Sequence, residues 1–410
     1  MRVEWNSKTL GEVCSFLSRG ISPAYLAAGG ICVLNQKCVR DHRVSYEPSR
    51  RHDEQAKKVG SERLVRAGDV LVNSTGTGTL GRVAQLREDP LEPTTVDSHV
   101  TIVRPKSHLF YPDFFGFMLV TIEDAIKEAG EGCGGQTELA RSALAEKFVV
   151  HYPDSLREQQ RIVGILDEAF EGIATAKANA TKNVQNARAL FENHLQSVFA
   201  QRGPGWVEKP VKELAAPAKG SIRTGPFGSQ LLHSEFVDEG IAVLGIDNAV
   251  ANEFRWGKSR FITPEKYRQL ERYRVHPGDV LITIMGTCGR CAIVPDDIPI
   301  AINTKHICCI TLDRSKCLPS YLHIYFLHAP QAQAFLVKHA KGAIMAGLNM
   351  GLIQELPVML PPAEVQATIV EAADDLREET QRLAHLYERK LELLEALRKS
   401  LLHRAFAGRL

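Results

Sequence analysis

The sequence predicts an α+β protein with two tandem globular domains, each followed by one long helix, related by approximate two-fold internal symmetry. Three observations lead to this fold class: a long apolar stripe at helical spacing, a second copy of it 207 residues further on, and a repeat of the segments before each stripe. A chain of 410 residues also exceeds a single hydrophobic core. The expected segments are a first globular domain (1–155), a central spacer helix (156–203), a second globular domain (204–362) and a C-terminal spacer helix (363–410).

The first apolar stripe lies between residues 158 and 202. Small or apolar residues recur there at steps of three and four, which is typical of one helix face: Ile162, Leu166, Ala169, Ile173, Ala176, Ala180, Val184, Ala187, Phe191, Leu195 and Val198. Nine of the eleven positions stay apolar in the second copy: Ile369, Ala373, Leu376, Thr380, Leu383, Tyr387, Leu391, Leu394, Arg398, Leu402 and Ala405. Neither stretch contains proline, and a helix of roughly 42 residues is about 63 Å long.

Helices of this length predict an antiparallel coiled coil. A 63 Å rod extends beyond a domain of about 150 residues, whose radius of gyration is about 15 Å, so we expect the two stripes to face each other. The first helix ends where the second domain begins, and the second helix starts where that domain ends. Facing stripes must therefore run in opposite directions, which returns the C-terminus to the first domain. The alternative is that each stripe docks only on its own domain.

The globular domains repeat the same elements in the same order. Trp5 returns as Trp206, and Gly68-Asp-Val-Leu71 returns as Gly278-Asp-Val-Leu281. Short β-branched runs predict strands at Ile31–Leu34, Val70–Val72, Val100–Val103, Ile241–Leu244, Val280–Ile284 and Ile307–Leu312, and apolar spacing predicts helices at Phe114–Ala129 and Tyr321–Lys338. Each domain should therefore contain a twisted, partly antiparallel sheet with long surface loops, where recognition residues usually lie.

Composition indicates a globular protein without an extended basic tail. The chain is 44% hydrophobic and 24% charged, with a formal net charge of +2. Residues 1–157 carry 20 basic and 20 acidic side chains, and residues 204–362 carry 17 and 14. Binding to nucleic acid would therefore use local patches. The sequence has neither an apolar run long enough to cross a bilayer nor a signal peptide, so we expect a cytoplasmic protein with reduced cysteines.

The segment Gly76-Thr-Gly-Thr-Leu-Gly81 matches the dinucleotide-binding pattern G-x-G-x-x-G. That pattern requires a following helix, whereas residues 82–86 are typical of a strand, and the second copy is two residues shorter. We therefore expect a tight glycine turn at a sheet edge, with Thr75, Thr77, Thr79 and Arg82 exposed.

Other candidate catalytic or metal-binding residues have simpler structural explanations. Cys288 and Cys291 with Cys308 and Cys309 could suggest zinc, but the first copy has no cysteines at the positions that match the last three, so small buried hydrophobic residues are favoured. His99 and the equivalent His306 are expected to be shared structural hydrogen-bonding residues. We find no serine-nucleophile, phosphate-loop, zinc-protease or adenine-methyltransferase motif. The sequence thus predicts no catalytic, cofactor-binding or metal-binding residues.

Basic and polar loop residues remain as candidates for DNA contact. Lysine and arginine suit phosphate oxygens, and arginine, asparagine, glutamine, serine and threonine reach base edges. Acidic residues are interleaved with them, so a merely solvated face stays open as an alternative. The candidates are Arg43, Arg50, Arg51, Lys57, Thr75, Thr77, Thr79, Arg82, Arg223, Thr224, Arg255, Lys258, Arg260, Thr287, Arg290 and Lys305.

With these features in order, the whole chain resembles the specificity subunit of type I restriction–modification systems. The resemblance rests on the paired domain openings, the Gly-Asp-Val-Leu strands and several short stretches: Gly225-Pro-Phe-Gly-Ser229, Glu158-Gln-Gln-Arg-Ile-Val163, Val365-Gln-Ala-Thr-Ile-Val370, Phe199-Ala200 and Phe406-Ala407-Gly408. The second helix opening lacks the Glu-Gln-Gln run, and the first has Asp154-Ser155 where prolines are usual.

This resemblance implies a non-catalytic DNA-binding subunit. Each globular domain would be a target-recognition domain for one half of a bipartite, asymmetric sequence in double-stranded DNA, with half-sites about one helical turn (roughly 34 Å) apart. The helices would set the gap between the half-sites and dock two methyltransferase (modification) subunits, which a restriction subunit (translocase and endonuclease) would join. S-adenosylmethionine and ATP would belong to those partners. Two alternatives remain: a fused restriction or methylation enzyme acting alone, and an interaction scaffold unrelated to DNA.

Overall fold

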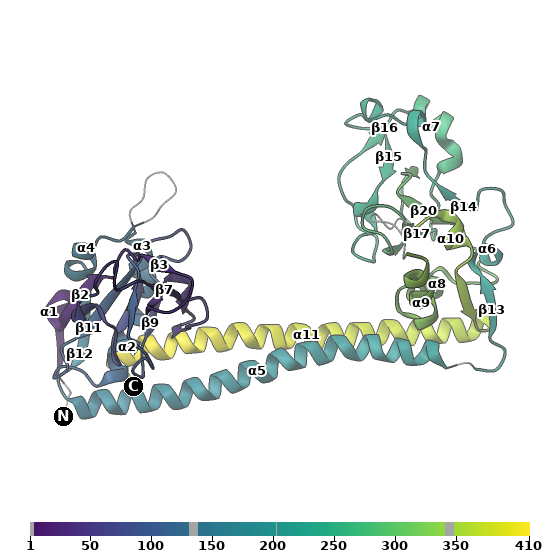
Figure 1. Cartoon of the computed structure of the whole chain (residues 1–410). Coiled ribbons are helices and arrows are strands. Elements are labelled where there is room, and N and C mark those ends of the chain that lie inside the picture. The colour runs from purple at the N-terminus through teal and green to yellow at the C-terminus, as the bar shows by residue number, and fades with distance from the viewer. Residues whose placement is uncertain (1–3, 131–137, 202, 341–347) are drawn as a thin grey trace. The chain divides into compact units, whose positions relative to one another are not determined.

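The computed structural model describes residues 4–130, 138–201, 203–340 and 348–410, which form two compact units (Figure 1). Unit 1 comprises Met1–Ala180 with Arg389–Leu410, and unit 2 comprises Thr181–Glu388. Each unit therefore combines one globular domain with one end of each long helix. No helix in the described ranges is both long enough and apolar enough to cross a membrane.

The globular part of unit 1 is built around two four-stranded sheets. Its elements are β1 (Trp5–Thr9), α1 (Leu10–Val13), β2 (Cys14–Arg19), β3 (Tyr25–Leu26), β4 (Ile31–Leu34), η1 (Gln36–Cys38), β5 (Val39–Arg40), β6 (Arg43–Val44), β7 (Arg50–His52), η2 (Ser61–Arg63), β8 (Val70–Asn73), β9 (Val83–Gln85), β10 (Thr94–Val96), β11 (Val100–Pro105), α2 (Pro112–Thr121), α3 (Glu123–Glu128), α4 (Arg141–Glu146) and β12 (Val149–Pro153). One sheet has the order β2-β11-β8-β9 and is antiparallel, and the other has the order β10-β4-β7-β3, with β10 parallel to β4.

The globular part of unit 2 repeats this plan. Its elements are β13 (Val207–Pro210), α6 (Val211–Leu214), β14 (Ile222–Thr224), η3 (Gly228–Gln230), η4 (His233–Glu235), β15 (Ile241–Leu244), η5 (Ile246–Asn248), β16 (Phe261–Ile262), α7 (Pro264–Leu270), η6 (Glu271–Tyr273), β17 (Val280–Thr283), β18 (Cys291–Ile293), β19 (Ala301–Asn303), β20 (Ile307–Ile310), α8 (Pro319–His328), α9 (Pro330–Ala340), α10 (Met350–Gln354) and β21 (Pro357–Leu360). The order β14-β20-β17-β18 matches β2-β11-β8-β9, and β16-β15-β19 matches β7-β4-β10. The expected duplication is confirmed at the level of strand order.

The two expected domain helices are each split into two. The segment expected as Phe114–Ala129 forms α2 and α3, because Ile122 leaves the helical conformation (φ −101°, ψ 5°). The segment expected as Tyr321–Lys338 forms α8 and α9. Pro330 follows Ala329, and proline disfavours helical backbone in the residue before it.

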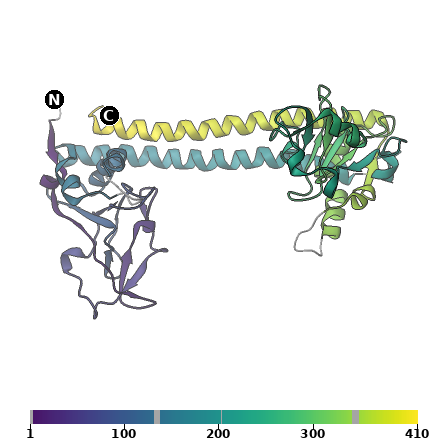
Figure 2. The same cartoon turned by 90° about the horizontal axis from the view of Figure 1, so that it is seen from above.

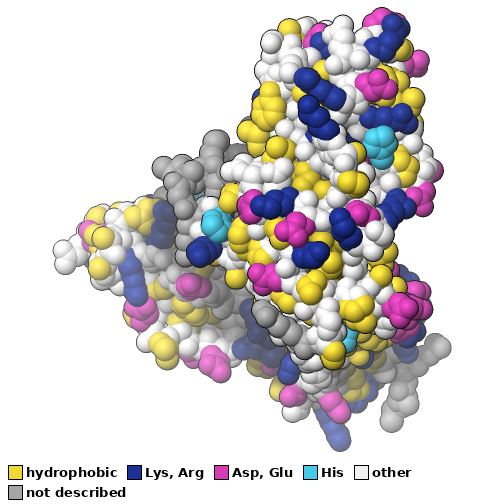
Figure 3. Space-filling model, turned by 90° about the vertical axis from the view of Figure 1, so that its right-hand side faces the viewer, with side chains coloured by type: hydrophobic (Ala, Val, Ile, Leu, Met, Phe, Trp, Pro, Cys, Tyr) yellow, Lys and Arg dark blue, Asp and Glu magenta, His cyan; other side chains and the backbone are white. Residues whose placement is uncertain are grey.

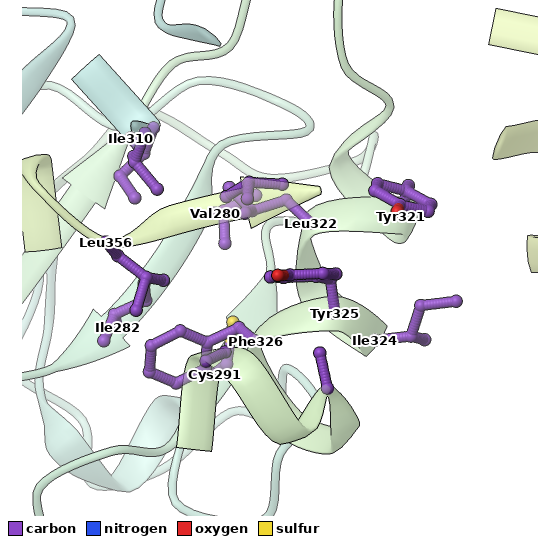
Figure 4. Packing of buried hydrophobic residues seen from close by; sticks show 14 of the residues in the cluster. Val280, Ile282, Cys291, Ile310, Tyr321, Leu322, Ile324, Tyr325, Phe326 and Leu356 are labelled. Atoms are coloured by element: carbon purple, nitrogen blue, oxygen red, sulfur yellow. The ribbon is translucent and has the colours of Figure 1, made fainter. Parts of the chain in front are cut away.

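The core of unit 2 lies between α8 and the four-stranded sheet (Figure 4). Tyr321, Tyr325 and Phe326 of α8 pack toward Val280 and Ile282 of β17. All five side chains are fully buried, so each contributes roughly 1.5–3 kcal/mol of hydrophobic free energy. In the equivalent core of unit 1, phenylalanines of α2 occupy this layer.

The long helices are α5 (Leu156–Ala200) and α11 (Ala363–Phe406). All eleven stripe positions of α5 are buried or half-buried, as are ten of the eleven in α11. The exception is Leu383, which is 37% exposed while its neighbour Ala384 is buried. Of the first expected helix (156–203), Arg202 lies outside the described residues.

The two helices run antiparallel within each unit, as expected. In unit 1, Arg161 Nη2 donates to the Leu410 carbonyl oxygen at 3.2 Å, and Lys177 Nζ pairs with Glu395 Oε2 at 2.7 Å. Residue numbers thus rise along α5 as they fall along α11. In unit 2, Arg188 pairs with Glu388 at 2.9 Å, and Phe191 lies beneath the guanidinium of Arg377. Figures 1 and 2 show α5 and α11 side by side in both views.

The helix ends also dock on the globular domains. Phe406 of α11 packs on Phe114 with ring centroids 4.9 Å apart in unit 1, and Phe199 of α5 packs on Tyr325 at 5.2 Å in unit 2. Each domain therefore receives the start of one helix and the end of the other. The alternative in which each stripe packs only on its own domain is excluded.

A buried glutamine fixes the start of each helix to its domain. Gln159 donates from Nε2 to the carbonyls of Leu109 and Pro153, and its Oε1 accepts from the Tyr111 N–H at 2.8 Å. Gln366 makes the same three bonds with Lys316, Pro361 and Leu318. Both side chains are at most 1% exposed, so the likeness between the two helix openings has a structural cause.

Glycine is required where the chain crosses a neighbouring strand. A Cβ added to Gly225 would lie 1.9 Å from the Asn303 carbonyl oxygen, and one added to Gly20 would lie 1.9 Å from that of Val96. No side chain fits at that distance. This explains the first residue of the Gly-Pro-Phe-Gly-Ser stretch.

Candidate nucleic-acid interface

Three loops that are distant in sequence meet at one place in unit 1. They are Asn35-Gln36 after β4, the turn 74–82 between β8 and β9, and the turn 97–99 between β10 and β11. Gln36 Nε2 donates to Thr75 Oγ1 at 2.7 Å, Thr79 Oγ1 donates to Gln36 Oε1 at 3.0 Å, and Thr75 Oγ1 is 2.7 Å from His99 Nδ1. We call this surface the unit 1 corner.

Unit 2 forms the same arrangement from the equivalent loops, and we call it the unit 2 corner. It consists of Gly245-Ile246 after β15, the turn 284–290 between β17 and β18, and the turn 304–306 between β19 and β20. The Ile284 N–H donates to the His306 carbonyl at 2.9 Å, just as the Ser74 N–H donates to the His99 carbonyl at 2.8 Å in unit 1. This backbone bond thus recurs in both units, whereas the β17–β18 turn is two residues shorter than the β8–β9 turn and the side chains differ.

The unit 2 corner carries several cationic groups. Arg260 pairs with Asp247 Oδ1 at 2.5 Å, and the Lys258 N–H donates to Asp247 Oδ2 at 2.6 Å. Burial lowers the pKa of His306, and the nearby charges of Lys305 and Arg260 lower it further. The predicted residues Lys258, Arg260 and Lys305 therefore gather at this corner.

The predicted threonines of the glycine turn are less exposed than expected. Thr77 is exposed at the tip of the turn, but Thr75, Thr79 and Arg82 are half-buried. The reason is internal hydrogen bonding: the threonines bind Gln36, and Arg82 Nη2 donates to the Gly78 carbonyl at 3.0 Å. The expectation of exposure is therefore wrong for these three residues.

The other predicted residues of unit 1 lie on separate elements. Arg50 of β7 stands over the Tyr25 ring at 4.8 Å, and Arg51 pairs with Glu92 at 2.6 Å. Lys57 Nζ donates to the Ser22 carbonyl at 3.2 Å. Arg43 lines a cavity of about 980 Å³ that residues of α5 and α11 also line, so the structure does not bring it into the corner.

In unit 2, three of the remaining candidates are exposed. Thr287 and Arg290 lie on the β17–β18 turn, and Arg255 pairs with Glu253. Thr224, at the end of β14, is half-buried. For all these residues, contact with DNA stays a prediction.

Arg223 is placed in the interior, contrary to the expectation of an accessible side chain. It is 9% exposed, and its Nη2 pairs at 2.6 Å with Asp279, the aspartate of Gly-Asp-Val-Leu. Unit 1 has the same feature, because Arg104 pairs at 2.7 Å with the equivalent Asp69. A buried carboxylate needs a paired cation. The guanidinium of Arg223 is thus used inside unit 2.

Sequence reasoning missed Gln36 and Ile246 as members of the corners. The available signal was positional: Asn35-Gln36 follows the strand Ile31–Leu34 as Gly245-Ile246 follows Ile241–Leu244.

Most of the cysteines that suggested a metal are packed in hydrophobic cores. Cys291, Cys308 and Cys309 are fully buried, and burial raises the pKa of the Cys308 thiol to about 12. Thiols in such surroundings stay protonated and behave as small apolar groups. Within the described ranges, no group of three or more His, Cys, Asp or Glu side chains is arranged to hold a metal ion.

Charges are dispersed on the face shown in Figure 3. Lysine and arginine side chains stand singly or in small groups among acidic and apolar ones. This distribution agrees with the near balance of 17 basic and 14 acidic side chains in residues 204–362. The basic side chains of this face are therefore local features, without a single continuous basic stripe.

The fold and the paired corners define a class of protein: two loop-bearing recognition domains of one topology, joined by antiparallel helices. A family model described as type I restriction modification DNA specificity domain matches residues 2–184 and 240–393. The chain therefore belongs to this family.

Individual relatives agree with this assignment. The chain is 29% identical over 174 residues to the type I restriction enzyme EcoBI specificity subunit of Escherichia coli, a match that covers 42% of this chain and 36% of that protein. It thus spans only about a third of that curated relative.

Two solved structures share the fold over the full length. One, from work on complex assembly and conformational transition of the type I R-M system, has a TM-score of 0.78 at 16% identity and covers 100% of both chains. The other, the HsdS subunit from Thermoanaerobacter tengcongensis, has a TM-score of 0.61 at 17% identity and covers 99% of this chain and 97% of that one. At these identities the likeness shows the fold alone.

Proposed function

We propose that this chain is the DNA-specificity subunit of a type I restriction–modification complex. Each unit binds one half of a bipartite, asymmetric target in double-stranded DNA, using the loops of its corner in the major groove. The observation that carries the proposal is the pair of corners. Matched backbone hydrogen bonds with different side chains suit two DNA-binding sites that arose by duplication and prefer different bases.

The long helices α5 and α11 have a separate role in the proposed function. They join the two units and dock two methyltransferase subunits, to which a restriction subunit adds. The chain itself performs no catalysis. S-adenosylmethionine and ATP are bound by the partner subunits. Membership of a DNA-specificity family supports this division of roles.

Selection from random double-stranded DNA tests the proposal. The full-length chain, assembled with type I modification subunits, should enrich two short half-sites separated by a fixed number of unspecified base pairs. Binding should also weaken steeply as salt rises, because phosphate contacts release counterions. The proposal would be contradicted if the recovered DNA showed no enriched half-sites, or if the binding affinity did not change with salt concentration.

The same preparation separates a subunit from a self-sufficient enzyme. The chain alone is incubated with target DNA, labelled S-adenosylmethionine, ATP and magnesium. We expect neither methylation nor cleavage until modification and restriction subunits are added. Turnover by the chain alone would favour the enzyme alternative.

A further inference from the structure

The side chain of Gln36 is held by two hydrogen bonds in the unit 1 corner. Its carboxamide is held from both sides, because Nε2 donates to Thr75 Oγ1 at 2.7 Å and Oε1 accepts from Thr79 Oγ1 at 3.0 Å. The Asn73 Nδ2 also donates to the Gln36 backbone carbonyl at 3.1 Å. Both the backbone and the amide plane of Gln36 are thus oriented before any ligand binds, which lowers the entropic cost of binding.

Thr75, which binds the side chain of Gln36, also contacts His99. Thr75 Oγ1 accepts the hydrogen bond from Gln36 Nε2 and lies 2.7 Å from His99 Nδ1. Hydrogen-bond contacts thus run from Gln36 through Thr75 to His99 and link three loops.

The carboxamide of Gln36 has hydrogen-bonding capacity that its protein partners do not use. A carboxamide has two N–H groups and two oxygen lone pairs. Among the described residues, the side chain of Gln36 uses one of each, with Thr75 and Thr79. One donor and one acceptor of this half-buried side chain therefore remain for a ligand. Adenine presents the complementary pair in the major groove, N7 as acceptor and N6–H as donor.

The equivalent position in unit 2 cannot make these bonds. Ile246 replaces Gln36, and Met285, 40% exposed, replaces Thr75. The backbone nearby is similar, because the Ile284 N–H donates to the His306 carbonyl as the Ser74 N–H donates to the His99 carbonyl. The two corners therefore differ chemically at this position, because unit 1 has the hydrogen-bonding amide of Gln36 and unit 2 has the apolar side chain of Ile246.

We propose that Gln36 reads one adenine in the half-site bound by unit 1, through paired hydrogen bonds to N7 and N6, and that Ile246 leaves the matching position of the other half-site without such a contact. This inference rests on the proposed DNA-binding function. It assigns one base of one half-site to one side chain.

The test compares Gln36→Ile with its mirror variant Ile246→Gln. Each full-length variant, assembled with modification subunits, is put through selection from random DNA beside the wild type. Gln36→Ile should reduce the preference for adenine at one position of one half-site by roughly 10- to 100-fold and leave the other half-site unchanged. Ile246→Gln should change only the other half-site. Lys37→Ala, which alters the exposed neighbour, should weaken binding without changing base preference.

A second measurement uses the wild type alone and so does not depend on the variants folding. Replacing the assigned adenine with 7-deazaadenine removes the N7 acceptor and should weaken wild-type binding about tenfold. No effect of 7-deazaadenine at any adenine of that half-site, or unchanged selection by Gln36→Ile, overturns the inference while the proposed function stands. A wild type that selects no sequence overturns the proposed function itself.

Discussion

At the scale of single residues, each domain contains one buried ion pair that involves the aspartate of its Gly-Asp-Val-Leu strand. Asp279 is 1% exposed and accepts hydrogen bonds from Arg223, from Thr311 Oγ1 at 2.6 Å and from the His276 N–H at 2.9 Å. Removing one partner of a buried pair leaves the other charge without compensation. Substitutions at these residues therefore test folding, whereas substitutions at the exposed loop residues test the proposed DNA contacts.

Asp279→Ala should destabilise unit 2 by about 3–5 kcal/mol, because it leaves the Arg223 guanidinium buried and unpaired. Trp206 and Trp256 both lie in unit 2, so fluorescence in a Trp5→Phe background follows the urea unfolding of that unit. Arg290→Ala, at an exposed position, should change the free energy of unfolding by no more than about 0.5 kcal/mol. A loss below about 1 kcal/mol for Asp279→Ala would show that the pair is dispensable.

The crossing glycines give a second test at this scale. In Gly225→Ala, the new Cβ meets the Asn303 carbonyl oxygen at 1.9 Å, so the strands must move apart, and we expect unit 2 to lose roughly 1–3 kcal/mol or more. Gly164→Ala is the matched control. Nothing lies within 4 Å of its added Cβ, and α5 should gain about 1 kcal/mol from the better helix former. Equal effects of the two substitutions in urea unfolding would refute the steric argument.

At the scale of elements, a β-hairpin of unit 1 links the domain to α11. Asp41 and His42 both have positive φ at the turn between β5 and β6. His42 Nε2 lies 3.2 Å from Glu123 Oε2, and Arg398 of α11 donates to His42 Nδ1 at 3.0 Å. Glu123 thereby anchors a contact between the recognition domain and the second long helix.

This contact should make unit 1 sensitive to acid. Burial by itself raises the pKa of Glu123, but hydrogen bonds from His42, Lys127 and the Val83 N–H outweigh it and lower the pKa to about 2 from 4.5. Because the folded pKa is depressed, the stabilisation is present above pH 4.5 and is lost as the pH falls toward 2. Its size is up to about 3 kcal/mol.

The measurement is the unfolding free energy of unit 1 against pH, followed by Trp5 fluorescence in a Trp206→Phe, Trp256→Phe background. Glu123→Gln should flatten the curve between pH 4.5 and 2, whereas Glu88→Gln, at an exposed position, should leave it unchanged. Parallel curves for Glu123→Gln and the parent would contradict the role given to this carboxyl.

The accuracy of the sequence predictions follows from how local each signal is. The strand Ile31–Leu34 and the long helices were predicted because a β-branched run and helical periodicity are local properties of the chain. The break at Ile122 was missed, since no proline marks it. The pairing of Arg223 with Asp279 joins residues 56 positions apart, and an exposed arginine and a buried one look alike in a sequence. The role of Gln36 depends on three loops meeting, which no local pattern encodes.

At the scale of the whole molecule, duplication explains why both units exist and why they differ. Strand order, the glutamine at each helix start and the buried Arg-Asp pair recur in both copies. The arginine has changed strand between them, from β11 in unit 1 to β14 in unit 2. Features that maintain the fold are thus repeated, while the side chains at the corners have diverged. That pattern suits two recognition sites that share a scaffold and bind different half-sites.

In the proposed function, the paired helices determine the spacing of the two half-sites and the corners determine their sequences. Deleting residues 181–187 of α5 together with 385–391 of α11 shortens each helix by about two turns, or about 10 Å. Target selection with this variant, assembled with modification subunits, is the most direct test. We predict the same two half-sites, with the unspecified gap between them shorter by about three base pairs at 3.4 Å per pair. Altered half-site sequences with an unchanged gap would contradict the claim.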